Sequence, residues 1–177
     1  ETDIIVDAKS GVTGAGRGLK LQNSFCECTE NMKAYKVATH RHTSEIEQEL
    51  SNVAGEEIMI SFTPHLIPQK RGILSTIYVN LNRKSSAEEL TEMYKEFYKD
   101  EFFVRVKEVG DLPETKHVAG SNFVDIGVCY DERLQRAVVV SSLDNIVKGA
   151  AGQAVQNMNL LFGLDEKTAL TNPGFYL

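Results

Sequence analysis

Tryptophan is absent from this 177-residue sequence, and only three cysteines and four prolines are present. Cys26, Cys28 and Cys129 are an odd number and too few for a disulfide framework, which favours a reducing, cytoplasmic location. Basic residues are outnumbered, because 19 Lys and Arg face 25 Asp and Glu and give a formal charge of −6. This balance argues against nucleic-acid binding, which depends mostly on Lys and Arg at phosphates.

Long apolar runs are also absent, since no run approaches the roughly 18 residues of a membrane span, which excludes a transmembrane protein. The first residues contain neither an initiator methionine nor a basic-then-apolar signal pattern. A strand pattern begins almost at once, at residues 4–6. We therefore expect a fragment of a longer protein, cut at a domain boundary.

The pattern of apolar residues predicts one α+β domain. Capping boxes at Ser44 with Glu47 and at Ser86 with Glu89 predict the starts of two helices, and Asp144 is a plausible N-cap for a third. We expect a mixed, largely antiparallel sheet with helices packed on it. The predicted strands are residues 4–6, 58–62 (ending at Pro64), 72–81, 102–106, 123–130 and 137–142.

Two of the predicted helices carry apolar stripes at helical spacing. Gly163 predicts the end of the last helix, which spans 144 to 162. The stripe of the second helix contains Ala87, Leu90, Met93, Tyr94, Phe97 and Tyr98. The stripe of the last helix contains Val147, Ala151, Ala154, Met158 and Leu161.

A loop with four glycines in residues 11–18 follows the first strand. It lacks the third glycine of the dinucleotide-binding pattern G-x-G-x-x-G, and it lacks the phosphate-binding pattern G-x-x-x-x-G-K-[ST]. Spacing alone favours an ordinary tight surface loop. The functional alternative is that bare backbone N–H groups and Arg17 together bind an anion.

Two histidines, His40 and His42, flank an arginine directly before a predicted helix N-terminus. That position lowers the pKa of a histidine and attracts anions. The plainer interpretation is a pair of solvated loop histidines. A third alternative is a zinc site that combines them with Cys26 and Cys28, although the spacing within each pair is shorter than is usual for structural zinc.

Five ordered segments together resemble N-acetyl-gamma-glutamyl-phosphate reductase: residues 6–17, 38–48, 62–76, 120–126 and 144–157. The resemblance implies an enzyme of arginine biosynthesis, which uses NADPH to reduce N-acetyl-gamma-glutamyl phosphate to the semialdehyde. It also implies an N-terminal Rossmann domain followed by an α+β domain. That second domain is similar to the C-terminal domain of glyceraldehyde-3-phosphate dehydrogenase-like enzymes.

The resemblance also implies roles for individual residues. A histidine near pKa 6.5 suits proton transfer in the family reaction, with His40 the first choice and His42 the second. Fork-shaped cations suit the phosphate and carboxylate of the substrate, and Arg17 and Arg71 are the candidates, with Glu45 a weaker one for positioning. For Arg71, a surface ion pair is the plainer alternative. The residues expected against the nicotinamide half of NADP are Ser10, Gly11, Thr13 and Gly14; no metal is expected.

One departure from the family decides what this chain can do alone. The family's catalytic cysteine and its G-x-G-x-x-G both precede the matching segment, so we expect the fragment to be inactive by itself. We expect residues 1–143 to bind substrate and form a dimer or tetramer. Residues 144–177 would form a helix and tail that pack on the missing Rossmann domain. A non-catalytic oligomerisation module is the alternative that the residues leave open.

Overall fold

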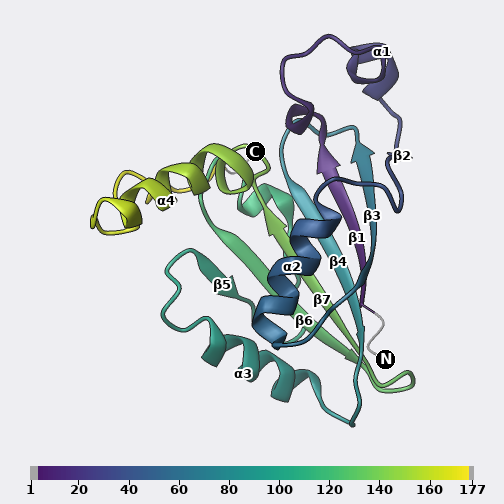
Figure 1. The fold of residues 1–177 in the computed structure, drawn as a ribbon, viewed down its shortest axis with the longest axis vertical. Helices are drawn as coiled ribbons and strands as arrows, with labels where there is room; N and C mark the ends of the chain where they lie inside the picture. The colour runs from purple at the N-terminus through teal and green to yellow at the C-terminus, as the bar shows by residue number, and fades with distance from the viewer. Residues whose placement is uncertain (1–3, 176–177) are drawn as a thin grey trace.

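Seven strands form one mixed sheet in the computed structural model, which describes residues 4–175 (Figure 1). Their order across the sheet is β2-β3-β1-β4-β7-β6-β5. The pairs β1–β3 and β5–β6 are parallel and the other four are antiparallel, which confirms the predicted mixed, largely antiparallel sheet. The strands are β1 (Ile4–Gly11), β2 (Lys33–Ala34), β3 (Ile60–Ile67), β4 (Ile73–Asn80), β5 (Val104–Val106), β6 (Val124–Asp131) and β7 (Arg136–Leu143).

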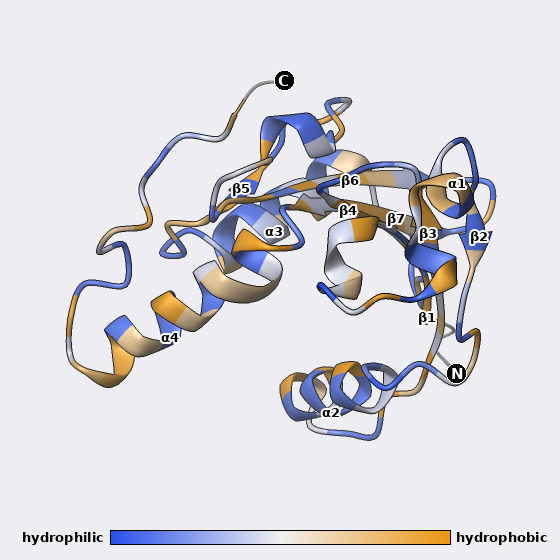
Figure 2. Ribbon diagram, turned by 90° about the horizontal axis from the view of Figure 1, so that it is seen from above, coloured by the Kyte–Doolittle hydropathy of each residue, from blue (hydrophilic) through white to orange (hydrophobic). Residues whose placement is uncertain are grey.

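The three longest helices lie on the same side of this sheet (Figure 2). They are α2 (Thr43–Ala54), α3 (Ala87–Phe97) and α4 (Gly152–Leu161). No helix of the described residues is both long enough and apolar enough to cross a membrane. The shorter helical segments are η1 (Val12–Ala15), η2 (Leu21–Asn23), α1 (Phe25–Cys28), η3 (Thr115–His117) and the π-helical η4 (Val147–Ala151).

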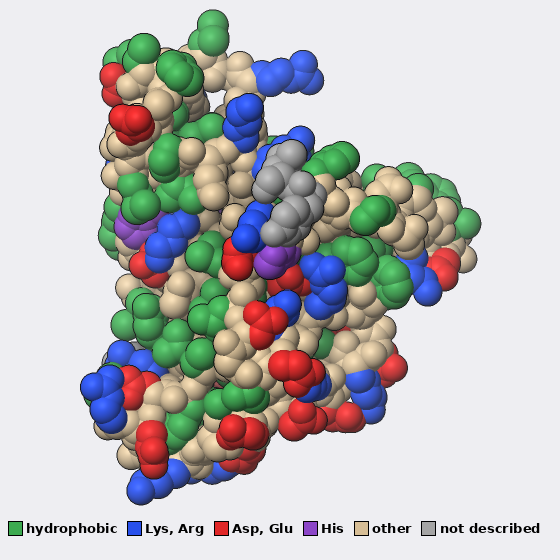
Figure 3. Space-filling model, turned by 180° about the vertical axis from the view of Figure 1, so that it is seen from behind, with side chains coloured by type: hydrophobic (Ala, Val, Ile, Leu, Met, Phe, Trp, Pro, Cys, Tyr) green, Lys and Arg blue, Asp and Glu red, His purple; other side chains and the backbone are tan. Residues whose placement is uncertain are grey.

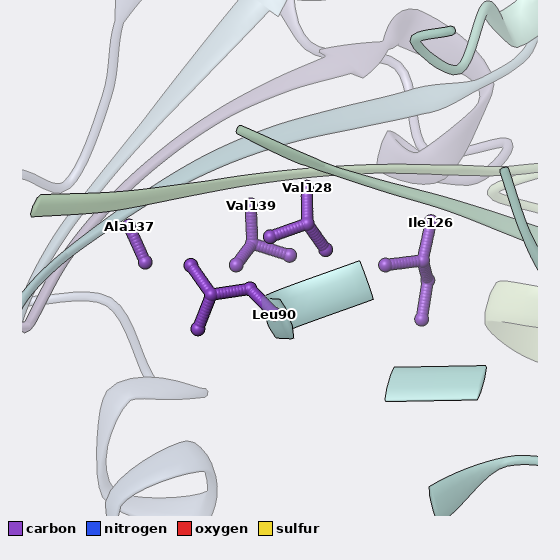
Figure 4. Close-up of a cluster of buried hydrophobic side chains, with 5 residues drawn as sticks. All are labelled: Leu90, Ile126, Val128, Ala137 and Val139. Carbon is purple, nitrogen blue, oxygen red and sulfur yellow. The ribbon is translucent and has the colours of Figure 1, made fainter. Parts of the chain in front are cut away.

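The hydrophobic core lies where α3 packs on the middle strands. Leu90 of α3 is 5% exposed and points at Val128, Ala137 and Val139 of β6 and β7 (Figure 4). Val139 pairs with Val128 on one side and with Ile77 of β4 on the other, so three strands present aliphatic side chains to the helix. Burial of each such side chain stabilises the fold by about 1.5–3 kcal/mol.

The predicted stripe of α3 is wider than the surface that the sheet covers. Leu90, Tyr94 and Tyr98, four residues apart, pack on the core. Met93 and Phe97 are 54% and 68% exposed, so the expectation that they share this buried face is wrong. The reason is that both lie one step round the helix from the row of residues that meets the strands.

The predicted end of the second strand (58–62) at Pro64 is also wrong, because the corresponding strand, β3, runs through Pro64 to Ile67. Proline is tolerated here because the carbonyl of Pro64 still accepts a hydrogen bond from Tyr35 N, 3.0 Å away. Proline has no backbone N–H, so it cannot donate a hydrogen bond back to the neighbouring strand. The ladder between β2 and β3 stops there, and β2 ends at Ala34.

Only one of the two predicted capping boxes forms a cap. The hydroxyl of Ser86 accepts a hydrogen bond from Glu89 N at 3.1 Å, as predicted. Ser44 instead lies inside α2, whose N-cap is His42, and its hydroxyl donates weakly to Arg41 O at 3.4 Å. The carboxylate of Glu47 accepts a hydrogen bond from Ile60 N at 3.1 Å, so it ties α2 to the start of β3 rather than closing the helix end.

The final helix ends where the sequence predicts, but it does not begin at residue 144: the π-helical η4 covers Val147–Ala151 and α4 starts at Gly152. Its apolar stripe faces outward. Asp144 Oδ1 accepts hydrogen bonds from Ile146 N and Val147 N, and Gly163, with a φ of 67°, follows the last turn. The buried positions of α4 are Gly152, Gln156 and Asn159. The predicted stripe residues Met158 and Leu161 are 46% and 84% exposed.

Candidate functional site

The glycine loop after β1 packs against the turn that leads into β4. Gly11 N donates to Gly72 O and Val12 N donates to Gln69 O, both at 2.8 Å. The Thr13 hydroxyl donates to Lys70 O at 2.5 Å. One end of the sheet therefore brings together the segment of Ser10, Gly11, Thr13 and Gly14 and the segment that carries Arg71.

Glycine is required at two positions of these turns, by the close approach of the other turn at Gly11 and by Thr115 and a positive φ at Gly72. A Cβ on Gly11 would lie 2.9 Å from Lys70 O, which real Cβ atoms do not tolerate. Gly72 has a φ of 110°, and a Cβ there would lie 2.8 Å from Thr115 Cβ. Both backbone conformation and space thus select glycine at 72.

Arg71 is anchored but still accessible. Its Nη1 lies 3.2 Å from Asp144 Oδ1, and its side chain is 45% exposed while that of Asp144 is fully buried. Burial is the largest single influence on Asp144 and works to raise its pKa, but hydrogen bonds from the backbone of Gly120, Val147 and Ile146 and the charge of Arg71 together lower the pKa below its usual value. The carboxylate therefore stays charged and holds one side of the guanidinium.

Asn145 completes this end of the sheet and was missed by the sequence analysis. Its Oδ1 accepts from Gly72 N at 2.8 Å, and its Nδ2 donates to Thr13 Oγ1 at 3.0 Å. The sequence carries a signal only in the position of Asn145, directly after a capping aspartate. Spacing along the chain cannot show that its amide lies between two distant turns.

Arg17 and Glu45 are not brought into these contacts. Arg17 is exposed beside a hollow of about 640 Å³ lined by Val12, Thr13 and residues 16–21, 23 and 24. Within residues 4–175 it makes no ion pair, so its charge is available to a ligand. Glu45 is exposed in the first turn of α2.

His40 and His42 lie together just before and at the start of α2. Their ring centroids are 4.9 Å apart, and His40 also contacts the edges or faces of Tyr35 and Phe62, with centroids 5.6 and 5.3 Å away. The backbone N–H of His42 donates to His40 Nδ1 at 3.2 Å. In this arrangement the neutral imidazole of His40 carries its proton on Nε2.

The environment of His40 opposes its positive charge. Burial lowers its pKa below 6.5, and the neighbouring charges of His42, Lys36 and Arg41 lower it further. His40 is therefore neutral at pH 7. In the described part of the chain, no hydrogen bond, ion pair or ring contact joins the histidine pair to the Arg71 cluster.

The zinc alternative finds no support in the structure. Cys28 is buried and its Sγ donates to Gln22 O at 3.2 Å, while Cys26 is exposed. His40 contacts the rings of Tyr35, Phe62 and His42, as described above. Among residues 4–175 no three His, Cys, Asp or Glu side chains converge as metal ligands would.

Comparison with known proteins identifies relatives of the whole chain. The family model described as "semialdehyde dehydrogenase, dimerisation domain" matches residues 1–145. N-acetyl-gamma-glutamyl-phosphate reductase of Acetivibrio thermocellus is 65% identical over 175 residues, which are 99% of this chain and 51% of that protein. The enzyme of the same name from Pelotomaculum thermopropionicum is 57% identical, over 99% of this chain and 50% of its own length. The chain thus spans about half the length of these relatives.

A solved structure shows the same fold. Aspartate semialdehyde dehydrogenase II from Vibrio cholerae superposes with a TM-score of 0.70 at 19% identity. The match covers 91% of this chain and 55% of that one. At this identity the likeness supports the architecture alone, which agrees with the predicted α+β domain.

The lowered pKa of His40 gives a direct test by NMR titration. We expect the ring resonances of His40 to titrate with a midpoint below 6.5, and His42→Ala to raise that midpoint, because it removes a neighbouring charge. Since the folded state disfavours protonation, His40 stabilises the fold above pH 6.5, and this contribution is lost as the pH falls below that value. A midpoint at or above 6.5 would contradict the described environment.

Proposed function

The chain belongs to the semialdehyde dehydrogenase, dimerisation domain family, and on this basis we propose that it is the C-terminal half of an NADP-dependent N-acetyl-gamma-glutamyl-phosphate reductase. The observation that carries the proposal is the 65% identity to a reductase of that name across 99% of this chain. The reaction is the reduction of the acyl phosphate to the semialdehyde with release of phosphate. We place it in arginine biosynthesis in the cytoplasm.

Two arginines at the glycine-loop end of the sheet are the candidates to bind the anionic groups of the substrate. Arg71 is fixed by Asp144 on one side and is exposed on the rest of its guanidinium, which suits two parallel hydrogen bonds to phosphate or carboxylate. Arg17, exposed on the loop, is the second cation. Glu45 is the weaker candidate, for positioning.

The histidine pair supplies the proton chemistry. Neutral His40, with its proton on Nε2, can donate a hydrogen bond to the oxygen of the reacting acyl group. His42 is exposed and can exchange a proton with water. A pair of this kind divides the stabilisation of charge and the movement of the proton between two side chains.

The loop backbone fits the nicotinamide half of NADP. Gly14 is exposed, although a Cβ on it would lie 3.4 Å from Asn145 Nδ2 and 3.7 Å from Ser10 Oγ. A Cβ on Gly16 would meet nothing within 4 Å, so the backbone there faces open space. The hydroxyl of Thr13 ties this loop to Lys70 O, whereas the hydroxyl of Ser10 lies 3.4 Å from the carbonyl of the adjacent Gly11. When bound, NADPH supplies the hydride. The role of this chain is to provide a backbone surface, free of side chains, against which the nicotinamide ring can lie.

The C-terminal helix is built to meet a further domain. It attaches to its own domain through polar contacts: Asn122 Nδ2 and Lys148 Nζ donate to Gln156 Oε1 at 3.0 and 2.8 Å. Meanwhile Leu161 and Phe162 are 84% and 78% exposed, and α4 projects away from the sheet (Figures 1 and 2). We assign this apolar face to the nucleotide-binding half, with residues 144–177 forming the bridge.

The side of the sheet opposite the helices is the surface for a second copy of the chain. Side chains alternate across a strand, so Ile5 lies on the opposite face from buried Val6. Ile5, Tyr78, Val138 and Cys129 form one row across β1, β4, β7 and β6. The view from behind shows hydrophobic side chains gathered over this part of the sheet (Figure 3). Such a face is suited to dimerisation.

The full-length protein should catalyse NADPH oxidation with N-acetyl-gamma-glutamyl phosphate, whereas the 177-residue chain alone should not. His40→Ala in the full-length protein should lower kcat by about 10²- to 10⁴-fold, as is typical for groups that assist proton transfer. Ser86→Ala, which removes a remote helix cap, is the control and should leave kcat unchanged. Turnover by the isolated chain, or no turnover by the full-length protein, would overturn the proposal.

The exposed face of α4 should drive self-association of the isolated chain. We expect Met158→Glu with Leu161→Glu to lower its oligomeric order, because exposed apolar patches of this kind find partners. Sizing by light scattering measures the change. Leu134→Glu, a similar substitution of an exposed leucine in the β6–β7 turn, is the matched control. Equal masses for the two variants would show that α4 is not a contact surface.

A further inference from the structure

Asp144 and Asn145, at the end of β7, belong to none of the candidate site positions, yet both are buried, at 0% and 6% exposure. We propose that they are positioning residues of the substrate site. Asp144 orients the guanidinium of Arg71, and Asn145 orients the loop that carries Thr13. The proposal deepens the proposed function and rests on it.

Asn145 joins two turns whose contacting residues, Thr13 and Gly72, lie 59 positions apart in the chain. Its Oδ1 accepts the hydrogen bond of Gly72 N at 2.8 Å, next to Arg71. Its Nδ2 donates to Thr13 Oγ1 at 3.0 Å and more weakly to Gly11 O at 3.4 Å. Thr13 in turn donates to Lys70 O. One amide therefore fixes the distance between the glycine loop and the arginine turn.

The carboxylate of Asp144 accepts hydrogen bonds from three separate segments of the chain. Its Oδ2 accepts from Gly120 N at 2.7 Å, and its Oδ1 accepts from Ile146 N and Val147 N at 2.7 and 2.9 Å. These fixed backbone donors leave the carboxylate no freedom to rotate. Among residues 4–175, Arg71, whose Nη1 lies 3.2 Å from Oδ1, is the one charged and exposed donor to this carboxylate. A rigid carboxylate thus determines where an otherwise flexible arginine points.

The competing explanation is that the pair only starts the final helix. A purely structural role lowers stability without a selective effect on any substrate. If the pair positions Arg71, its loss instead raises the KM for the substrate whose anionic group Arg71 binds, while kcat changes little. The two explanations therefore separate in the balance between KM and kcat.

The experiment uses the full-length enzyme in the reverse direction, with the semialdehyde, NADP and varied inorganic phosphate. We expect Asp144→Asn to raise the KM for phosphate about tenfold, the size expected when a charge-assisted hydrogen bond is lost. Arg71→Lys should do the same, because a point charge cannot replace the fork. The variant that carries both Asp144→Asn and Arg71→Lys should have the same KM for phosphate as Arg71→Lys alone, since both changes act through one guanidinium.

The second arm tests Asn145 separately and does not depend on the folding of the Asp144 variant. Asn145→Ala should raise the KM for NADP about fivefold, and Thr13→Val should raise it by the same factor. The variant that carries both changes should show no larger increase in this KM than either change alone. Asn80→Ala is the matched control. This asparagine ends β4, at the end of the strand away from Arg71, and its Oδ1 accepts a hydrogen bond from Arg136 Nε at 2.9 Å, so its loss should lower thermal stability and leave both KM values unchanged.

Additive effects in both cycles, or KM values within twofold of the wild type, would overturn the positioning role. Wild-type turnover in the same assay is the check on the proposed function. If the wild type shows none, the proposed function fails, and calorimetric titration of inorganic phosphate into the same proteins tests the Asp144–Arg71 pair by itself. Loss of phosphate binding in both single variants supports the pair, and unchanged binding overturns it.

Discussion

Neighbouring carboxylate and amide groups at Asp144 and Asn145 hold together the end of the sheet where the candidate site lies. Turns that meet at a sheet end leave backbone N–H groups without strand partners, and a buried N–H left unpaired costs about 1–3 kcal/mol. Here Asp144 satisfies the N–H groups of Gly120, Ile146 and Val147, and Asn145 satisfies that of Gly72. The position of Arg71 follows from this arrangement.

The same junction connects the site with the helix that reaches outward. The chain leaves Asp144 and Asn145 directly into η4 and α4, so the residues that hold Arg71 are joined by a short segment to the final helix. Because α4 buries Gln156 and Asn159 and exposes Leu161 and Phe162, its attachment to this domain is polar while its free face is apolar. A partner domain seated on that face would therefore also stabilise the site.

Much of the fold could be predicted from local patterns. The strands, the Ser86 cap and the turn at Gly163 depend on neighbours in sequence, and the structure contains them. The errors arise where a distant segment decides. Pro64 stays within a strand because the segment beside it needs only the Pro64 carbonyl, as the acceptor for Tyr35 N. Glu47 does not cap the helix with Ser44 because its carboxylate accepts a hydrogen bond from Ile60 N instead.

The site shows the same division. The sequence could mark Arg71 and Thr13 by residue type and by resemblance, and the structure brings their segments together. Asn145 could not be found in this way, because its contacts with Thr13 and Gly72 cross 132 and 73 positions of the chain. Arg17 and Glu45 remain predictions, since both side chains are exposed.

Hydrogen–deuterium exchange of single amides tests most directly whether the Asp144–Asn145 pair holds the site together. In Asn145→Ala, the Gly72 amide should exchange at least tenfold faster than in the wild type, because it loses the partner at 2.8 Å. The amide of Leu90, in the distant α3, should keep its rate. Unchanged protection of Gly72, or equal acceleration of both amides, would contradict the central role given to this junction.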